Sequence, residues 1–148
     1  MSTKKDKFNQ RDRFFMNLAF NLARDRSGLT GENPSVGCVI VKNDKVISLG
    51  QTGINGRPHA EYNAIKSSKC NLKGSKLYVS LEPCTHYGKT PPCSNFIIKS
   101  KIKEVIFSII DVDKRTKSKS FKVFKDKNIK VKSGLLKNEA NKIYKSYI

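Results

Sequence analysis

Three side chains of metal-binding type lie in two short segments of the sequence. His59 begins the segment His59-Ala60-Glu61, and Cys84 and Cys93 bracket a segment with eight residues between them. A catalytic zinc site usually takes three protein ligands and keeps a fourth position open, whereas a structural site is usually closed by four. The sequence therefore predicts a catalytic zinc centre with His59, Cys84 and Cys93 as its ligands.

The carboxylate nearest to this ligand set is Glu61, two residues after His59. Zn²⁺ lowers the pKa of a bound water from about 15.7 towards 7, so that a nucleophile exists at neutral pH. We expect Glu61 to take the water proton and return it to a ring nitrogen and the departing amine, which typically contributes about 10² to 10⁴ in rate. Glu82 is the rival acid, but we expect it to hydrogen-bond the backbone or the substrate.

The order of the two segments is that of the zinc deaminases, in which H-x-E precedes P-C-x-x-C. Either segment alone arises often by chance, and their joint order at the boundaries of expected elements makes the pattern specific. The alternative is that His59 only begins a helix and that the cysteines are inert. Of the other two cysteines, Cys38 lies in an apolar strand and Cys70 ends a polar helix, so we expect neither to bind metal.

Helices and strands alternate along the chain that must hold these residues. Apolar side chains recur four residues apart at Phe14, Leu18 and Leu22, with a neighbouring row at Phe15, Ala19 and Ala23. Asn43-Asp44 offers a hairpin turn. The sequence predicts an α/β protein with a three-layer α/β/α arrangement around a mixed sheet of about five strands. We expect helices over residues 11–26, 60–69, 93–100, 118–127 and 136–147, and strands over residues 36–41, 45–49, 76–81, 104–110 and 129–132.

Composition bounds the class of protein. The 148 residues are enough for one domain with its own core, and 30 Lys and Arg against 12 Asp and Glu give a net charge of +18. This charge favours an anionic partner, but the lysines are spread along the chain without a basic block, so nucleic acid is not the expected ligand. We expect no membrane-spanning segment and no export signal, which makes the reducing cytoplasm the expected location.

Three runs of sequence resemble the deaminase half of the bifunctional riboflavin-biosynthesis deaminase/reductase. They are NPSVGCVIV at residues 33–41, PHAE at residues 58–61 and LEPCTHYGKTPPC at residues 81–93. The last is the most specific, because most tRNA adenosine, cytidine and guanine deaminases use a shorter cysteine spacing. The resemblance implies the cytidine-deaminase-like fold and the substrate 2,5-diamino-6-(5-phosphoribosylamino)pyrimidin-4(3H)-one, whose 2-amino group is replaced by oxygen with release of ammonia.

The same resemblance implies four residues that bind substrate. Asn33 would contact the pyrimidine, His86 and Lys89 would lie beside the substrate with Lys89 as a phosphate partner, and Asp111 would approach the ribose. Three of them have a plainer alternative: Asn33 would shape the turn before Pro34, Lys89 would be a solvated loop lysine, and Asp111 would cap a loop.

The sequence departs from the family pattern at the expected ribose-phosphate end. A histidine commonly lies seven residues before the zinc histidine, an Asp-Pro-Asn-Pro follows the fourth strand, and a Gly-x-Gly lies further on. At these places the chain instead has Thr52, Val112, Lys114, Ser118 and Ser120. Lys114 and its neighbour Arg115 could still serve a phosphate.

Family members usually continue into a reductase domain that uses a nicotinamide cofactor. We expect a single zinc-dependent deaminase domain over residues 1–148 without that reductase, either as a stand-alone enzyme or as a domain cut from a longer one. Its expected partners are the small phosphorylated aminopyrimidine and, beyond that, a second copy of the chain or a separate reductase. The alternatives are a tRNA base deaminase and a catalytically silent, zinc-stabilised RNA-binding module, against which the intact Glu61 speaks.

Overall fold

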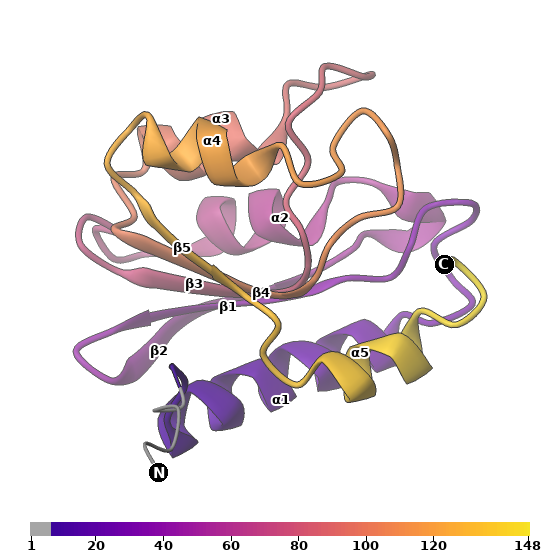
Figure 1. Ribbon diagram of the computed structural model, residues 1–148, viewed down its shortest axis with the longest axis horizontal. Coiled ribbons are helices and arrows are strands. Elements are labelled where there is room, and N and C mark those ends of the chain that lie inside the picture. Colours follow the sequence, from indigo (N-terminus) through magenta and orange to yellow (C-terminus); the bar gives the residue numbers. More distant parts are fainter. Residues whose placement is uncertain (1–6) are drawn as a thin grey trace, which may run out of the picture.

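A five-stranded mixed sheet in the order β2-β1-β3-β4-β5 forms the middle layer of the protein, with helices on both faces (Figure 1). The computed structural model describes residues 7–148. The strands are β1 (Gly37–Lys42), β2 (Lys45–Gln51), β3 (Lys76–Leu81), β4 (Glu104–Ile109) and β5 (Lys130–Ser133). The helices are α1 (Gln10–Asp25), α2 (Ala60–Ser67), α3 (Cys93–Lys99), α4 (Ser120–Lys125) and α5 (Lys137–Ile143), with a 3₁₀ turn η1 (Ile54–Gly56). The predicted three-layer α/β fold is confirmed.

The pairing of the strands divides the sheet into an antiparallel and a parallel part. β1 runs antiparallel to both β2 and β3, whereas β3, β4 and β5 are parallel to one another. The predicted hairpin turn is present, since Asn43 and Asp44 both have positive φ, at 52° and 62°. Two residues of this conformation match the twist of the flanking strands in a tight hairpin.

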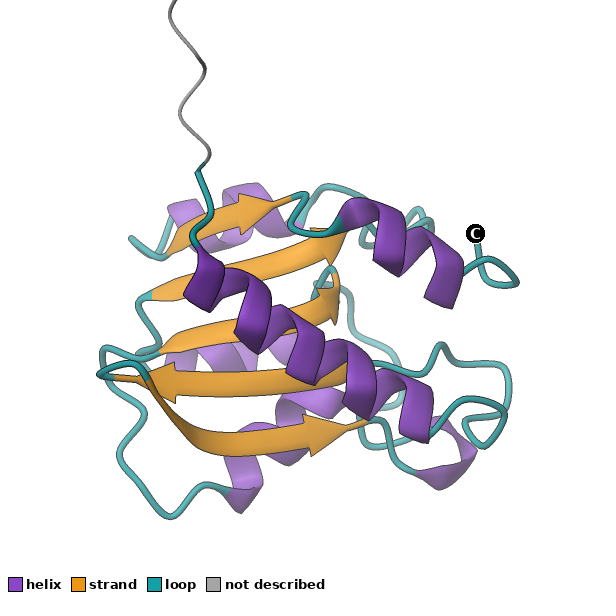
Figure 2. Cartoon of the chain, turned by 90° about the horizontal axis from the view of Figure 1, so that it is seen from below, coloured by secondary structure: helices purple, strands orange, loops and turns teal. Residues whose placement is uncertain are grey.

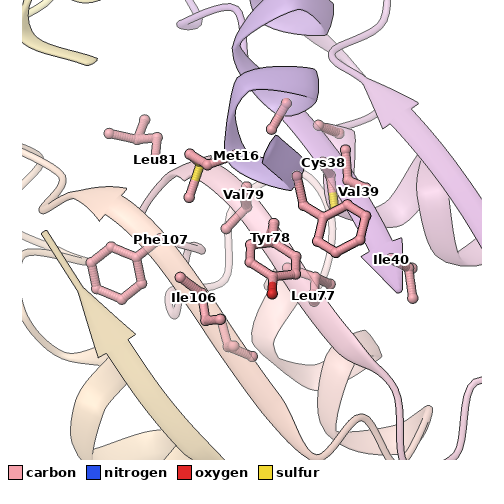
Figure 3. Close-up of a cluster of buried hydrophobic side chains, with 14 of the residues drawn as sticks. Met16, Cys38, Val39, Ile40, Leu77, Tyr78, Val79, Leu81, Ile106 and Phe107 are labelled. Atoms are coloured by element: carbon pink, nitrogen blue, oxygen red, sulfur yellow. The ribbon is translucent and has the colours of Figure 1, made fainter. Parts of the chain in front are cut away.

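The central strands are buried on both faces, which explains their continuous apolar runs. Every residue of β4 is buried, as are the last five residues of β3 and the first five of β1. Figure 3 shows side chains of α1, β1, β3 and β4 packed into one cluster, among them Met16, Val39, Tyr78 and Phe107. Helices on both faces of the central strands favour apolar side chains there, although Ser80, Glu104 and Ser108 are buried among them.

Helix α1 begins at a capping box. The Asn9 side chain accepts from the Asp12 backbone N–H at 2.8 Å, and the Asp12 carboxylate accepts from the Asn9 N–H at 3.0 Å. The buried face is centred on the row through Phe15, Met16 and Ala19, whereas Phe14 of the row expected from the four-residue spacing is 49% exposed. The helix is therefore confirmed, but its core face is rotated towards the neighbouring row.

The last two helices are shorter than the sequence predicted at both ends, and left-handed residues stand where they were expected to begin. Ser118 has a φ of 60° and Leu136 a φ of 54°, and a residue in this conformation cannot belong to a right-handed helix. Helix α4 therefore begins at Ser120 and α5 at Lys137. After Ile143 the chain continues in a turn closed by the bond from Ile148 N to the Tyr144 carbonyl oxygen at 2.9 Å.

The two helical layers have different relations to the sheet. Helices α1 and α5 cover one face and α2, α3 and α4 the other (Figure 1), and α1 crosses the sheet diagonally beside α5 (Figure 2). The ends of β3 and β4 and the first turns of α2 and α3 consequently meet at one edge.

Within residues 7–148, no helix is both long enough and apolar enough to cross a membrane.

Gly50 lets α2 approach the sheet closely enough to bring its first turn to this edge. A Cβ atom at Gly50 would overlap the Ala60 carbonyl oxygen and the Ala64 nitrogen, and would lie 2.9 Å from the Ala64 Cα. Only a residue without a side chain fits between β2 and α2 here. This contact fixes the position of the segment that carries His59 and Glu61.

Candidate metal centre and active-site pocket

The structure brings together the three side chains predicted to bind metal. His59 is the residue before α2, Cys84 lies in the loop after β3, and Cys93 is the first residue of α3. The His59 Nδ1 atom is 3.6 Å from the Cys84 Sγ and 3.5 Å from the Cys93 Sγ. All three ligand atoms lie within 4.8 Å of one another, so the cluster can hold a metal ion.

The distances within the cluster fit zinc. In a tetrahedral site with Zn–S bonds of about 2.3 Å and Zn–N bonds of about 2.0–2.1 Å, a nitrogen and a sulfur ligand are about 3.6 Å apart. Both observed N···S distances agree with this value to about 0.1 Å. The imidazole nitrogen that faces both sulfurs is Nδ1, which the sequence did not predict. An imidazole with two thiolates is also a donor set typical of catalytic zinc.

The start of α3 favours the thiolate form of Cys84. The Cys93 backbone N–H donates to the Cys84 Sγ at 3.2 Å, in the first turn of a helix, where backbone N–H groups have no helical partner. Hydrogen bonds from the Cys93 thiol and, to a smaller extent, from His59 hold the pKa of the Cys84 thiol well below its ordinary value. A thiolate is the form that binds metal.

Glu61 lies in the first turn of α2, beside the ligand cluster, and is only 4% exposed. Burial, followed by the negative charge of Cys84, raises the pKa of the Glu61 carboxyl to about 7. A carboxyl group with a pKa near the working pH can both accept and donate a proton. Glu61 also lines the same pocket as His59 and Cys84.

Glu82, the rival acid, is occupied by hydrogen bonds that hold the following loop. Its Oε1 accepts from the backbone N–H groups of Asp111 at 3.1 Å and Ser118 at 3.0 Å. Its Oε2 accepts from the N–H of Ser120 at 3.2 Å and from the Ser120 hydroxyl. With 3% exposure and all of these donors in place, Glu82 ties the segment after β4 to the end of β3. The expected bonds to backbone are confirmed.

Three of the four residues predicted to bind substrate line the pocket beside the metal cluster. Asn33, His86 and Asp111 do so, in a cavity of about 90 Å³. The Asn33 Nδ2 donates to the Gly56 carbonyl oxygen at 2.9 Å, and the His86 Nδ1 lies 2.9 Å from the Thr116 Oγ1. These two hydrogen bonds fix the directions of the Asn33 and His86 side chains. The roles of Asn33, His86 and Asp111 towards substrate stay predictions.

Lys89 lies apart from these three residues. It is exposed, in the loop between Cys84 and Cys93, and is not among the residues that line the pocket. The two cationic side chains that do line it are those of Arg57 and Arg115. The phosphate role expected for Lys89 from the family pattern remains a prediction.

The pocket also contains residues that the sequence did not single out as site residues. Arg57 precedes the Pro58-His59 pair, and Tyr147 comes from the turn after α5 and donates its hydroxyl to the Asp111 Oδ1 at 2.7 Å. A charged residue two positions before a metal ligand was a signal that could have identified Arg57. No local pattern marks Tyr147, because only the packing of the C-terminal turn against the sheet edge brings it there.

Three of the departures from the family pattern have structural roles. Thr52 is buried and lines the pocket, and its Oγ1 accepts from the Val36 N–H at 2.9 Å. Ser118 and Ser120 stand where the family pattern has glycines, and both donate their backbone N–H groups to Glu82. Val112 and Lys114 are exposed, and nothing in the structure explains these two changes.

Comparison with known proteins places these features in a family. Residues 9–109 match the family described as the cytidine and deoxycytidylate deaminase zinc-binding region. The diaminohydroxyphosphoribosylamino-pyrimidine deaminase of Buchnera aphidicola from Schizaphis graminum is 42% identical over 137 residues, which cover 93% of each chain. The riboflavin biosynthesis protein RibD of Bacillus amyloliquefaciens is 40% identical over 93% of this chain but only 37% of its own length.

Solved structures agree with this placement. The deaminase/uracil reductase of Thermotoga maritima superposes with a TM-score of 0.84 at 37% identity, covering 90% of this chain and 39% of that one. The chain thus spans well under half of the RibD proteins that it matches and nearly all of the Buchnera deaminase. The chain belongs to the cytidine and deoxycytidylate deaminase zinc-binding family and, within it, to the diaminohydroxyphosphoribosylaminopyrimidine deaminases of riboflavin biosynthesis.

Proposed function

We propose that the chain converts 2,5-diamino-6-(5-phosphoribosylamino)pyrimidin-4(3H)-one and water to 5-amino-6-(5-phosphoribosylamino)uracil and ammonia. The observation that carries this proposal is a metal-binding His59/Cys84/Cys93 cluster that shares one pocket with the buried carboxyl of Glu61. A structural zinc site has no use for a buried carboxyl that lines the same pocket as its ligands. This arrangement therefore supports hydrolysis over a purely structural role for the metal.

Each residue of the pocket has a proposed part in the reaction. His59, Cys84 and Cys93 would hold Zn²⁺, which when bound supplies an acidified water as the nucleophile. Glu61 would take one proton from the attacking water and give it to the ring nitrogen as the C2–O bond forms. It would then carry the second water proton to the amine, so that the C2–N bond breaks and ammonia leaves. The proton acceptor and donor is the same carboxyl, which is why a pKa near neutrality suits it.

The hydrogen bonds already made within the pocket support the proposed substrate contacts. The Asn33 Nδ2 is bound to the Gly56 carbonyl oxygen, which leaves its Oδ1 to accept from an N–H of the pyrimidine. His86 lies beside the ring, steadied by Thr116. The Asp111 carboxylate, oriented by the Tyr147 hydroxyl, accepts from a ribose hydroxyl. Lys89 is proposed to approach the phosphate from the loop between the two cysteines.

Ammonia release from the purified diaminopyrimidine phosphate tests the proposal. The wild-type chain is expected to carry about one zinc per chain and to release ammonia, and Glu61→Gln is expected to keep its zinc while turnover falls about 10²- to 10⁴-fold. Lys66→Gln, an exposed change on the same helix, is the matched control. A folded, zinc-loaded wild-type chain without turnover would refute the function, and normal turnover by Glu61→Gln would refute the proton transfer alone.

The net charge of +18 is the one observation in favour of a second substrate class, a base in tRNA. Competition by tRNA against the small substrate tests this, and a salt-dependent inhibition at low tRNA concentration would support it.

We also propose that residues 1–148 act as one deaminase domain in the reducing cytoplasm, where thiol ligands stay reduced. A second copy of the chain or a separate reductase is its proposed protein partner.

A further inference from the structure

We propose that Arg57 is the residue that selects the phosphate group of the substrate, together with the loop that carries Lys89. This inference rests on the proposed function and assigns its phosphate subsite to one end of the pocket. The family pattern points to Lys89 and leaves Lys114 and Arg115 as other candidates. The contacts of Arg57 distinguish between these possibilities.

The Arg57 guanidinium lies against the loop between the two cysteine ligands, on both sides of Lys89. Its Nη1 donates to the Thr90 hydroxyl at 3.3 Å, and its Nη2 is 3.8 Å from the position of a Cβ on Gly88. Gly88 and Thr90 are the chain neighbours of Lys89. The two cationic residues therefore belong to one small region, although they lie 32 positions apart in the numbering.

In the described part of the chain, no carboxylate forms an ion pair with Arg57. Residues 83–92 contain neither Asp nor Glu. Arg57 also lines a second cavity, whose other side chains include the uncharged Tyr62, Pro91 and Phe96. A partly buried guanidinium without a carboxylate partner is a site for an anion supplied by a ligand.

Arg115, the other cation in the pocket lining, is already paired. Its Nε lies 3.0 Å from the Asp113 Oδ1 and its Nη2 lies 2.6 Å from the Asp113 Oδ2, so that the planar guanidinium and the carboxylate meet along one edge. This pair leaves the Arg115 side of the pocket near neutral. Of the two guanidinium groups in the pocket lining, that of Arg115 is therefore paired with a carboxylate, whereas that of Arg57 forms no ion pair within residues 7–148.

The place of Arg57 suits a substrate with a reactive ring at one end and a phosphate at the other. Arg57 and His59 line the same pocket, and a cavity of about 90 Å³ has room for the reacting ring rather than for the ribose phosphate as well. The phosphate then lies at the pocket mouth, where the fork of N–H groups on a guanidinium can bind two of its oxygens. The same group would give the chain its preference for phosphorylated over dephosphorylated substrate.

The test compares the phosphorylated substrate with the same compound after phosphatase treatment. For Arg57→Gln we expect kcat/KM on the phosphorylated substrate to fall about 10- to 100-fold, since a hydrogen-bonded charge pair is removed. On the dephosphorylated substrate the fall should stay below about 3-fold, and Arg57→Lys should recover part of the loss. Zinc content and circular dichroism verify that each variant is folded. Arg24→Gln, on α1 at the opposite face of the sheet, removes one positive charge elsewhere. It should leave kcat/KM unchanged on both substrates.

Three results would overturn the inference while leaving the proposed function in place. Equal losses on both substrates would mean that Arg57 supports the metal site or the fold. A loss no larger than that of Arg24→Gln would mean that it does not touch the phosphate, and a larger phosphate-specific loss in Arg115→Gln would move the subsite to the other side of the pocket. A wild-type chain that releases ammonia from neither compound would refute the proposed function itself, and this inference with it.

Discussion

Replacement of Glu82 by glutamine tests whether this carboxylate holds a loop or takes part in proton transfer. Each of its two oxygens accepts two hydrogen bonds. Three of these four bonds come from backbone N–H groups of the segment 111–120, and the fourth comes from the Ser120 hydroxyl. A glutamine has the same shape but one acceptor oxygen fewer. Its amide nitrogen can donate to the Ser120 hydroxyl but must then face the Ser120 N–H group.

The cost of this change follows from the bonds that are lost or weakened. One buried N–H without a partner costs about 1–3 kcal/mol, and the remaining bonds to a neutral acceptor are weaker by about 1 kcal/mol each. Relief from burying a charge returns part of this free energy. We expect a net loss of about 2–4 kcal/mol in the free energy of unfolding, which for a chain of this size lowers the melting temperature by about 5–15 °C.

Urea unfolding followed by circular dichroism measures the loss, alongside zinc content and ammonia release. We expect Glu82→Gln to keep its zinc, because none of its bonds reaches a metal ligand, and to lose kcat/KM because Asp111 and Thr116 lie in the loosened segment. Glu139→Gln, whose ion pairs lie on the exposed side of α5, should change stability by less than about 0.5 kcal/mol. If Glu82→Gln were as stable as wild type yet inactive, Glu82 would be a catalytic acid and the structural argument would be wrong.

Further predictions concern the metal, the packing of α2 and pH. Cys84→Ser should lose most of its bound zinc, measured per chain by elemental analysis. Cys70→Ser, at an exposed free cysteine, is the control and should keep its zinc. Zinc retention by Cys84→Ser would exclude Cys84 as a ligand. Gly50→Ala should lower the free energy of unfolding by about 1–3 kcal/mol or more, while Gly88→Ala, where an added Cβ has only ordinary contacts, should stay near wild type; equal stability of both would contradict the close contact of β2 with α2. In protein freed of metal by a chelator, burial raises the pKa of Glu61 to about 7 from an ordinary 4.5. Its protonated form then stabilises the fold below a pH of about 4.5, and this stabilisation is lost as the pH rises through 7. The difference in stability between wild type and Glu61→Gln should therefore fall over this interval, and a pH-independent difference would show that Glu61 is not buried in this way.

The metal ligands and the order of elements could be predicted from the sequence, because both depend on local features. His59, Glu61, Cys84 and Cys93 lie at positions where a helix starts or a strand ends, and apolar periodicity locates those boundaries. The alternation of strands and helices also sets the class of the fold, since parallel strands need crossovers that cover both faces. Zinc chemistry follows from residue type and ligand number, and these are visible without coordinates.

The electrostatics of the pocket and the contacts of its outer wall were decided only by the tertiary structure. Tyr147 reaches Asp111, Arg57 lies against the loop around Lys89, and Glu82 gathers the N–H groups of residues more than twenty-five positions away. Such contacts join segments that are distant in sequence, and no periodicity encodes which side chains will meet. Whether a cation is free for a ligand, as at Arg57, or neutralised by a neighbour, as at Arg115, depends on distances of a few ångströms that only the packed chain determines.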